Sequence, residues 1–383
     1  MMPTLPFNLI TTILLMLPVK TLVKFQGVCR AWRDLIRDPI FIKTDHFQNW
    51  ASKGNNYLLC VPLEPTPGRV FRLLSDKTFE RALDIQIPFE PVSMSLIVIG
   101  SCNGLLCITD LDNYGTIIYL YNPSIRKYRT INSPIVDIFG ISNRRYINIA
   151  LEFAYHDQAN DYKIVRIVSR GGDVDVDGDK VNVSFSKIEV YSMITNSWKD
   201  IDVDYFPWSM LGIRSKASLN ESVHWMVKHR DVNEDVPVIL AFHFGNEAFQ
   251  QISLPNYEDD LMEYIGTIKG NLSLFLFHVL YEDPLEEQCY LWVMKEYGVV
   301  GSWTKMYAVN INPNINPRVV TLLMFTTNEE IIFENGEEDV VSYHLGRKTI
   351  RSLGLEEQGY FNFVNYTESL VLLEGYYYGP QEG

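Results

Sequence analysis

The stretch that decides the fold is EVYSMITNSWKDI, residues 189–201. It has the pattern of a β-hairpin, because a short aromatic-rich strand is followed by a polar turn and a second strand. The same pattern recurs five times, as FRLLSDKTFERAL from Phe71, YLYNPSIRKYRTI from Tyr119, LAFHFGNEAFQQI from Leu240, LWVMKEYGVVGSWTKM from Leu291 and VSYHLGRKTIRSL from Val341. In chain order the six starting positions are 48, 70, 51, 51 and 50 residues apart.

This repeat predicts a β-propeller. A second apolar strand precedes several of the hairpins, such as NGLLCI from Asn103 and NESVHWMV from Asn220. A period near fifty residues with several strands per repeat is typical of propeller blades, which bury their faces against one another. We expect about six blades over residues 55–376, closed by pairing of Ser369–Leu373 with Tyr57–Val61. Two unrelated β-sandwiches with similar hairpins are the alternative.

Residues 3–47 have a helical pattern instead. The run LITTILLML (residues 9–17) places apolar residues at i, i+1, i+4, i+5 and i+8, and Pro18 ends it. Further helical stretches follow from Val19 to Phe25 and from Val28 to Asp38. About forty residues cannot bury all these apolar side chains internally, which predicts docking onto a partner or onto the rest of the chain. The expected fold is α+β in sequence order: a small three-helix module, then an all-β, propeller-like domain.

Composition and charge narrow the possible partners. The 383 residues are 47% apolar and 21% charged, as in folded proteins. The formal charge of −14 would repel nucleic acid and anionic membranes, so neither is expected as a partner. The apolar run at 9–17 is also far shorter than the ~20 residues that cross a bilayer. Five scattered cysteines indicate a reducing compartment, and we expect a cytoplasmic and/or nuclear location.

The N-terminal module resembles a known family. Residues 5–42 (LPFNLITTILLMLPVKTLVKFQGVCRAWRDLIRDPIFI) closely resemble an F-box, which binds the Skp-type adaptor of cullin–RING ubiquitin ligases. The resemblance implies that residues 3–47 form the F-box and that the adaptor contacts ten side chains. These are Leu5, Pro6, Ile10, Ile13, Leu14, Leu17, Pro18, Val28, Trp32 and Leu35; the last three would also pack internally.

The β domain is similar to the F-box-associated, kelch-like interaction domain of plant F-box proteins. The matching motifs are SCNGL (101–105), YNP (121–123), NDYKIV (160–165), HW (224–225) and LWVMKEYG (291–298). The last motif is also shared with the pollen S-locus F-box subgroup. The two resemblances cover nearly the whole chain, in the order F-box then target-recruiting domain.

We find no pattern for catalysis, a cofactor or a metal. The sequence lacks GxSxG, GxxxxGK, GxGxxG and HxxxH. Asp173, Asp175, Asp177 and Gly178 imitate the start of a calcium-binding loop, but Ser184 stands where that loop needs a bidentate Glu. A solvated hairpin tip is therefore expected there. Cys102 and Cys107 have no second pair nearby, so zinc is not expected either.

Acidic clusters at 258–263, 282–287 and 334–339 are expected to lie in solvated loops. Gathered at one end of a propeller, they would attract a basic protein target. Tyr205, Phe206 and Trp208 are candidate target-binding anchors, although core packing would explain them equally well.

The expected function is therefore that of a non-catalytic adaptor. The F-box would bind the Skp-type adaptor and through it the cullin, and the β domain would hold a protein target for ubiquitination and proteasomal degradation. Alternatives are a pollen S-locus recogniser of S-ribonucleases, a scaffold that degrades nothing, and a propeller enzyme such as a glycosidase.

Overall fold

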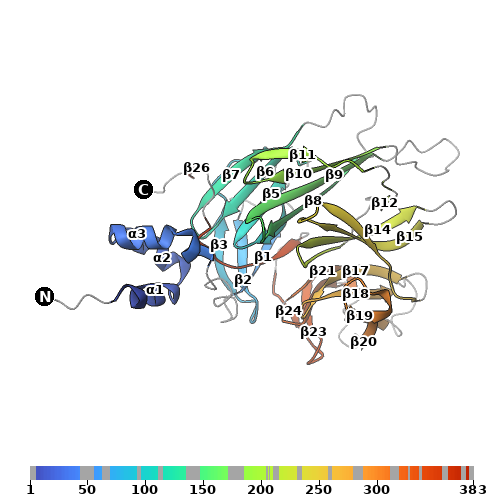
Figure 1. The fold of residues 1–383 in the computed structure, drawn as a ribbon. Helices are drawn as coiled ribbons and strands as arrows, with labels where there is room; N and C mark the ends of the chain where they lie inside the picture. Colours follow the sequence, from blue (N-terminus) through green and yellow to red (C-terminus); the bar gives the residue numbers. More distant parts are fainter. Residues whose placement is uncertain are drawn as a thin grey trace. The chain divides into compact units, whose positions relative to one another are not determined.

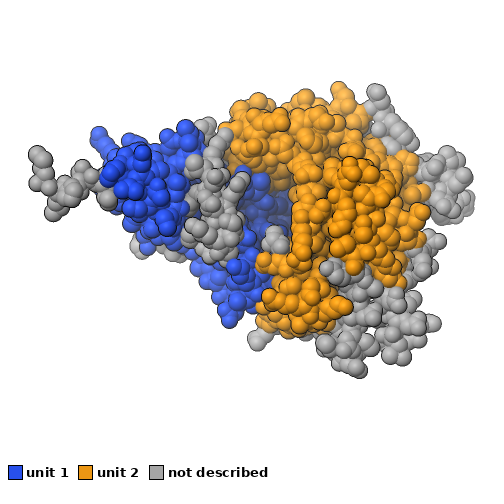
Figure 2. All heavy atoms as spheres, turned by 60° about the horizontal axis from the view of Figure 1, so that its bottom comes forward, with its two compact units in different colours: residues 1–133, 360–383 blue, residues 134–359 orange. Residues whose placement is uncertain are grey.

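The computed structural model describes most of the chain, and Figure 1 traces it in sequence order. The described residues are 6–43, 56–62, 70–92, 96–110, 115–134, 147–170, 185–203, 206, 208–209, 215–230, 235–257, 261–278, 288–310, 319–326, 328–335, 339–355, 361–371 and 377–378. The chain divides into two compact units, coloured separately in Figure 2. Unit 1 comprises residues 1–133 and 360–383, and unit 2 comprises residues 134–359.

Helices open unit 1. They are α1 (Phe7–Leu15), α2 (Val19–Phe25), α3 (Arg30–Arg37) and α4 (Pro39–Lys43). Pro6 and Pro18 directly precede α1 and α2, where a fixed φ and a missing N–H are tolerated. Asp38 caps the N-terminus of α4, because its Oδ1 accepts a hydrogen bond from the Ile40 amide at 2.7 Å. The three expected helices are present, and α4 is a further short one. None of the helices among the described residues is long and apolar enough to span a membrane.

Six antiparallel sheets follow within the described residues. Unit 1 contains sheets A and B. Sheet A has the order β25 (Phe361–Tyr366), β1 (Tyr57–Pro62), β2 (Val70–Ser75), β3 (Arg81–Gln86). Sheet B has the order β26 (Tyr377–Tyr378), β7 (Lys127–Asn132), β6 (Ile117–Asn122), β5 (Leu105–Asp110), β4 (Leu96–Cys102).

Unit 2 contains sheets C to F. Sheet C has the order β11 (Ser197–Asp200), β10 (Phe185–Ser192), β9 (Asp161–Arg170), β8 (Ile147–His156). Sheet D has the order β12 (Trp208–Ser209), β14 (Ser222–Arg230), β15 (Asp235–His243), β16 (Ala248–Ile252), with β13 (Lys216–Leu219) also paired to β14. Sheet E has the order β17 (Leu261–Ile268), β18 (Asn271–His278), β19 (Gln288–Met294), β20 (Trp303–Asn310), with a short 3-10 turn, η2 (Val300–Ser302), before β20. Sheet F has the order β21 (Val319–Phe325), β22 (Glu330–Asn335), β23 (Val340–His344), β24 (Thr349–Ser352).

The sheets are the six blades predicted from the hairpin period. The six quoted hairpins form one pair of adjacent strands in each of sheets A to F in order: β2–β3, β6–β7, β10–β11, β15–β16, β19–β20 and β23–β24. Within each unit, neighbouring sheets share apolar cores. Sheets A and B share one core in unit 1, while C with D, D with E and E with F share three in unit 2. Within each unit, adjacent blades thus bury a face against each other.

One detail of the closure was wrong. A late strand does pair with β1, as predicted, but that strand is β25 and not Ser369–Leu373. Tyr366 pairs with Tyr57, and Phe361 pairs with Pro62. Of the segment predicted to pair, residues 369–371 are described and follow β25 without strand structure. Within the apolar run SLVLL, Leu370 packs against the helices instead of joining the sheet.

Candidate functional site

The inner side of the helical module holds it together and attaches it to sheet B. Leu14, Val19, Leu22, Ile36 and Phe41 are almost completely buried in one cluster. Leu370 lies in the same cluster, and Ile125, from the turn between β6 and β7, packs against it. Lys20 forms an ion pair with Glu368 across 3.6 Å. The helices therefore have a core of their own that includes residues from the rest of unit 1.

The outer side of α1 is also apolar. Leu9, Ile13 and Met16 are 51%, 47% and 62% exposed, and their spacing of i, i+4 and i+7 puts them on one face. Phe7, Val28 and Ile40 add further exposed apolar surface. These six account for six of the thirteen exposed large hydrophobic side chains among the described residues, although the module is only about a tenth of the chain. Such a concentration marks an interaction surface. We call Leu9, Ile13 and Met16 the exposed stripe.

Nine of the ten residues predicted to contact an adaptor are described, and they fall into three groups. Pro6, Ile13, Pro18 and Val28 are exposed. Ile10, Leu17, Trp32 and Leu35 are half-buried and pack against the helical core, and the Trp32 ring lies 5.3 Å from that of Phe25. Leu14 is 1% exposed and lies in the helical core, and its contact with an adaptor stays a prediction. Leu5 lies outside the described residues.

The sequence reading missed part of the surface because it treated the apolar residues of α1 as a single stripe. With 3.6 residues per turn, the face of Ile10 and Leu14 lies about 100° around the helix from the face of Leu9 and Ile13. Plotting the positions at about 100° per residue would have separated the two faces and added Met16, which lies beside Leu9, to the list of candidates. The same plot places Phe7 beside the buried Leu14, so it would not have identified the exposed Phe7.

A buried polar network anchors the segment that carries Leu370. The Asn122 side chain donates hydrogen bonds to the carbonyl oxygens of Ser369 and Val371, at 3.2 and 3.0 Å. Gly104 has φ +74, and a Cβ there would come within 2.6 Å of the Thr367 carbonyl oxygen. The motifs SCNGL and YNP therefore secure this segment to sheet B.

Other motifs join strands and sheets in unit 2 in the same way. Asp161 accepts hydrogen bonds from the Ser192 hydroxyl and the Ile194 amide, at 2.6 and 3.0 Å. Lys163 donates to the Phe244 carbonyl at 3.0 Å, which links sheet C to the turn after β15. His224 contacts the Tyr297 hydroxyl through Nε2 at 2.8 Å, and burial lowers the pKa of its imidazole to about 4. These side chains are engaged in holding the fold.

The predicted target anchors have mixed positions. Tyr205 lies outside the described residues. Phe206 and Trp208 are half-buried against the core shared by sheets C and D. The Trp208 indole N–H donates to Gln251 at 2.9 Å, and the Phe206 ring meets the Trp208 ring edge-on at 5.2 Å. Both side chains contribute to packing in unit 2, and a role in target binding stays a prediction.

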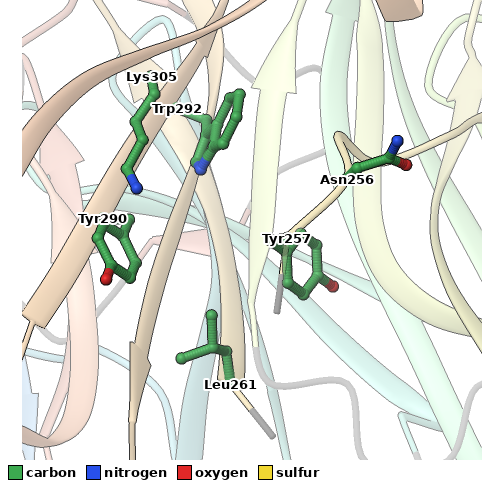
Figure 3. A pocket seen from close by; sticks show the side chains of 6 residues that line it. All are labelled: Asn256, Tyr257, Leu261, Tyr290, Trp292 and Lys305. Carbon is green, nitrogen blue, oxygen red and sulfur yellow. The ribbon is translucent and has the colours of Figure 1, made fainter. Parts of the chain in front are cut away.

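A pocket of about 340 Å³ opens beside sheet E. Figure 3 shows the six residues that line it: Asn256, Tyr257, Leu261, Tyr290, Trp292 and Lys305. Tyr290 and Trp292 come from β19, Lys305 from β20, and Leu261 from the first residue of β17. No motif search would single out this group, because its members come from three strands and a loop.

The described residues contain no group of His, Cys, Asp and Glu side chains arranged to hold a metal ion. The calcium-like run at 173–178 lies outside the described residues. None of the five cysteines, Cys102 and Cys107 included, forms a disulfide.

The comparisons with known proteins agree on both parts of the chain. The family model for the F-box domain matches residues 2–44, and that for the F-box associated beta propeller domain matches residues 74–373. F-box protein CPR1 of Arabidopsis thaliana is 27% identical over 375 residues, covering 93% of this chain and 86% of that protein. F-box protein At3g07870 of the same plant is 25% identical over 375 residues, covering 89% and 85%. The F-box/kelch-repeat protein At3g23880, also of Arabidopsis thaliana, is 23% identical over 315 residues, covering 80% of this chain and 79% of that protein.

Proposed function

The chain belongs to the family of F-box proteins with an F-box associated β-propeller domain, and we propose that it is the target-recruiting subunit of a Skp–cullin–F-box ubiquitin ligase. The observation that carries this proposal is the exposed stripe on α1. Because Leu14 and its neighbours already fill the helical core, the outward apolar residues have no packing role there. A Skp-type adaptor would cover them and link the chain to the cullin.

The β domain would hold the target, and the charge of unit 2 favours a basic one. Strands β9 and β10 are joined by residues 171–184, which contain four Asp and one Lys, and β18 and β19 by residues 279–287, which contain four acidic residues. The register pairs Arg170 with Phe185, so β9 and β10 end on the side of sheet C opposite its tight turns. Acidic connections would attract a basic partner and speed its association.

In this role the chain would catalyse nothing itself. Tethering a target beside the ubiquitin-carrying subunits raises its effective concentration there, and the bond-forming steps occur elsewhere in the complex. We also propose a cytoplasmic or nuclear location, which suits five cysteines that form no disulfide.

Affinity purification of the full chain from plant cells, with and without a proteasome inhibitor, tests the proposal. The expected result is co-purification of a Skp-type adaptor and a cullin, together with a protein that accumulates only when the proteasome is blocked. Absence of the adaptor would refute the ligase role. A stable partner whose level ignores the inhibitor would indicate a scaffold instead.

A further inference from the structure

We propose that the pocket beside sheet E binds an arginine or lysine side chain of the protein target. The inference rests on the proposed role of the β domain in holding a target, and it names the chemistry of one contact. It is based on three aromatic rings, a cation that already lies on one of them, and a carboxylate beside them.

The walls of the pocket are aromatic. Figure 3 shows Tyr290 and Trp292 on one side of the space and Tyr257 on the other. All three side chains are half-buried, so their rings are held in place while part of their surface faces the pocket. Aromatic rings carry negative charge on their faces, and they bind ammonium and guanidinium groups within about 6 Å. A volume of about 340 Å³ admits such a group.

A cation of the chain itself already uses this site. The Lys305 ammonium lies 3.6 Å from the centre of the Tyr290 ring. It reaches that ring because of a β-bulge in β20. Tyr290 and Trp292 are two residues apart on β19 and lie on the same face. Their partners on β20, Ala308 and Lys305, are three residues apart instead of two. In a regular strand, residues three apart point to opposite faces. The bulge turns Lys305 toward the aromatic face.

A carboxylate lies beside one aromatic wall. Glu263 accepts a hydrogen bond from the Tyr257 hydroxyl at 3.1 Å. Among the described residues that line the pocket, Lys305 is the one cation. When a cation of the target replaces the Lys305 ammonium, the Glu263 carboxylate supplies it with a nearby opposite charge.

The Lys305 ammonium therefore occupies the position that a cation of the target would take. Its side chain is exposed, so it can rotate into solvent when a side chain from the target enters. The incoming cation then takes over the aromatic contact and gains the Glu263 carboxylate. Acidic side chains meet repulsion at the same place, which gives the contact its specificity.

Fluorescence anisotropy with the full chain and a labelled twelve-residue peptide, (Gly-Arg)6, tests the inference; (Gly-Gln)6 and (Gly-Glu)6 serve as comparison peptides. Trp292→Leu should weaken binding of the Arg peptide about fivefold or more, because an aromatic face is lost. Lys305→Gln should tighten it about two- to fivefold by removing the competing cation. Lys228→Gln is the matched control, since it removes the same charge from an exposed position on sheet D.

The sign of the Lys305 effect decides the question. If Lys305→Gln weakens binding and the Glu peptide binds better than the Arg peptide, the pocket takes an anion and the inference is wrong. The inference is equally wrong if Trp292→Leu and Lys305→Gln both bind the Arg peptide with the same affinity as Lys228→Gln. Tyr290→Leu replaces Trp292→Leu if thermal unfolding shows that the tryptophan variant does not fold, and Tyr290→Phe should bind like the parent because it keeps the ring.

The same variants separate this inference from the ligase role. Each should still bind a Skp-type adaptor, because the pocket lies in unit 2 and the exposed stripe in unit 1. Loss of adaptor binding by the parent chain would refute the ligase role and leave the peptide result standing. Adaptor binding with no effect of the pocket variants on the peptide would refute only the pocket assignment.

Discussion

Replacing Leu9 and Ile13 together by alanine should weaken binding of a Skp-type adaptor about thirtyfold and leave the protein folded. Burying a whole Leu or Ile side chain contributes about 1.5–3 kcal/mol. Leu9 and Ile13 are 51% and 47% exposed, so a partner could still cover about half of each. That gives about 1 kcal/mol per side chain and about 2 kcal/mol for the pair, which corresponds to about thirtyfold in Kd.

Leu14→Ala provides the contrast on the same helix. Leu14 is 1% exposed, so its truncation leaves a cavity in the helical core and should cost about 2–5 kcal/mol of stability. The two variants thus differ in what they change, although they alter neighbouring residues. The exposed pair should change the affinity for the adaptor, and the buried residue should change the free energy of unfolding.

Isothermal titration calorimetry with purified adaptor measures the affinity, and thermal unfolding of each variant measures the stability. Val299→Ala with Val300→Ala is a suitable control, because these residues of unit 2 are 43% and 44% exposed and the change removes a similar apolar area. If Leu9→Ala with Ile13→Ala binds the adaptor as tightly as this control, the exposed stripe is not the docking surface. The reasoning also fails if Leu14→Ala weakens binding with no loss of stability.

Three further predictions concern the scaffold. Gly104→Ala should lower stability by about 1–3 kcal/mol more than Gly270→Ala, because both have positive φ but only the first would press an added Cβ into neighbouring atoms; paired melting curves check this. His224 has a pKa of about 4 when folded and about 6.5 when unfolded, so the unfolded state binds more protons and stability should fall as the pH drops from 6.5 to 4, by about 3 kcal/mol in all. Denaturant titrations across that range should show a shallower loss for His224→Gln, and an unchanged slope would contradict the assignment. Arg166→Met should cost about 3–5 kcal/mol because it leaves the buried Glu189 carboxylate, 2.8 Å from the Arg166 Nε, without that guanidinium; adding Glu189→Leu should recover part of the loss in the same assay.

The hairpins of the propeller could be predicted because each one is local. A strand, a polar turn and a second strand lie within thirteen to sixteen residues, so turn chemistry and alternation identify the pair without knowledge of the rest of the fold. The closing strand could not be identified in that way. Phe361–Tyr366 and Ser369–Leu373 are both short apolar runs near the C-terminus. The choice between them depends on contacts distant in sequence: Phe361–Tyr366 pairs with β1, and Leu370 packs against the helices.

The site was harder to predict than the fold, for a related physical reason. The motifs that carry the family resemblance, such as Asn122, Asp161 and His224, make buried hydrogen bonds that hold strands and sheets together. Because these side chains hold the fold together, they indicate the fold and are silent about the target. Target recognition needs side chains with free surface, as in the pocket lined by Tyr290 and Trp292. Those residues come together only through the pairing of strands and a β-bulge, and neither leaves a spacing that the sequence alone would reveal.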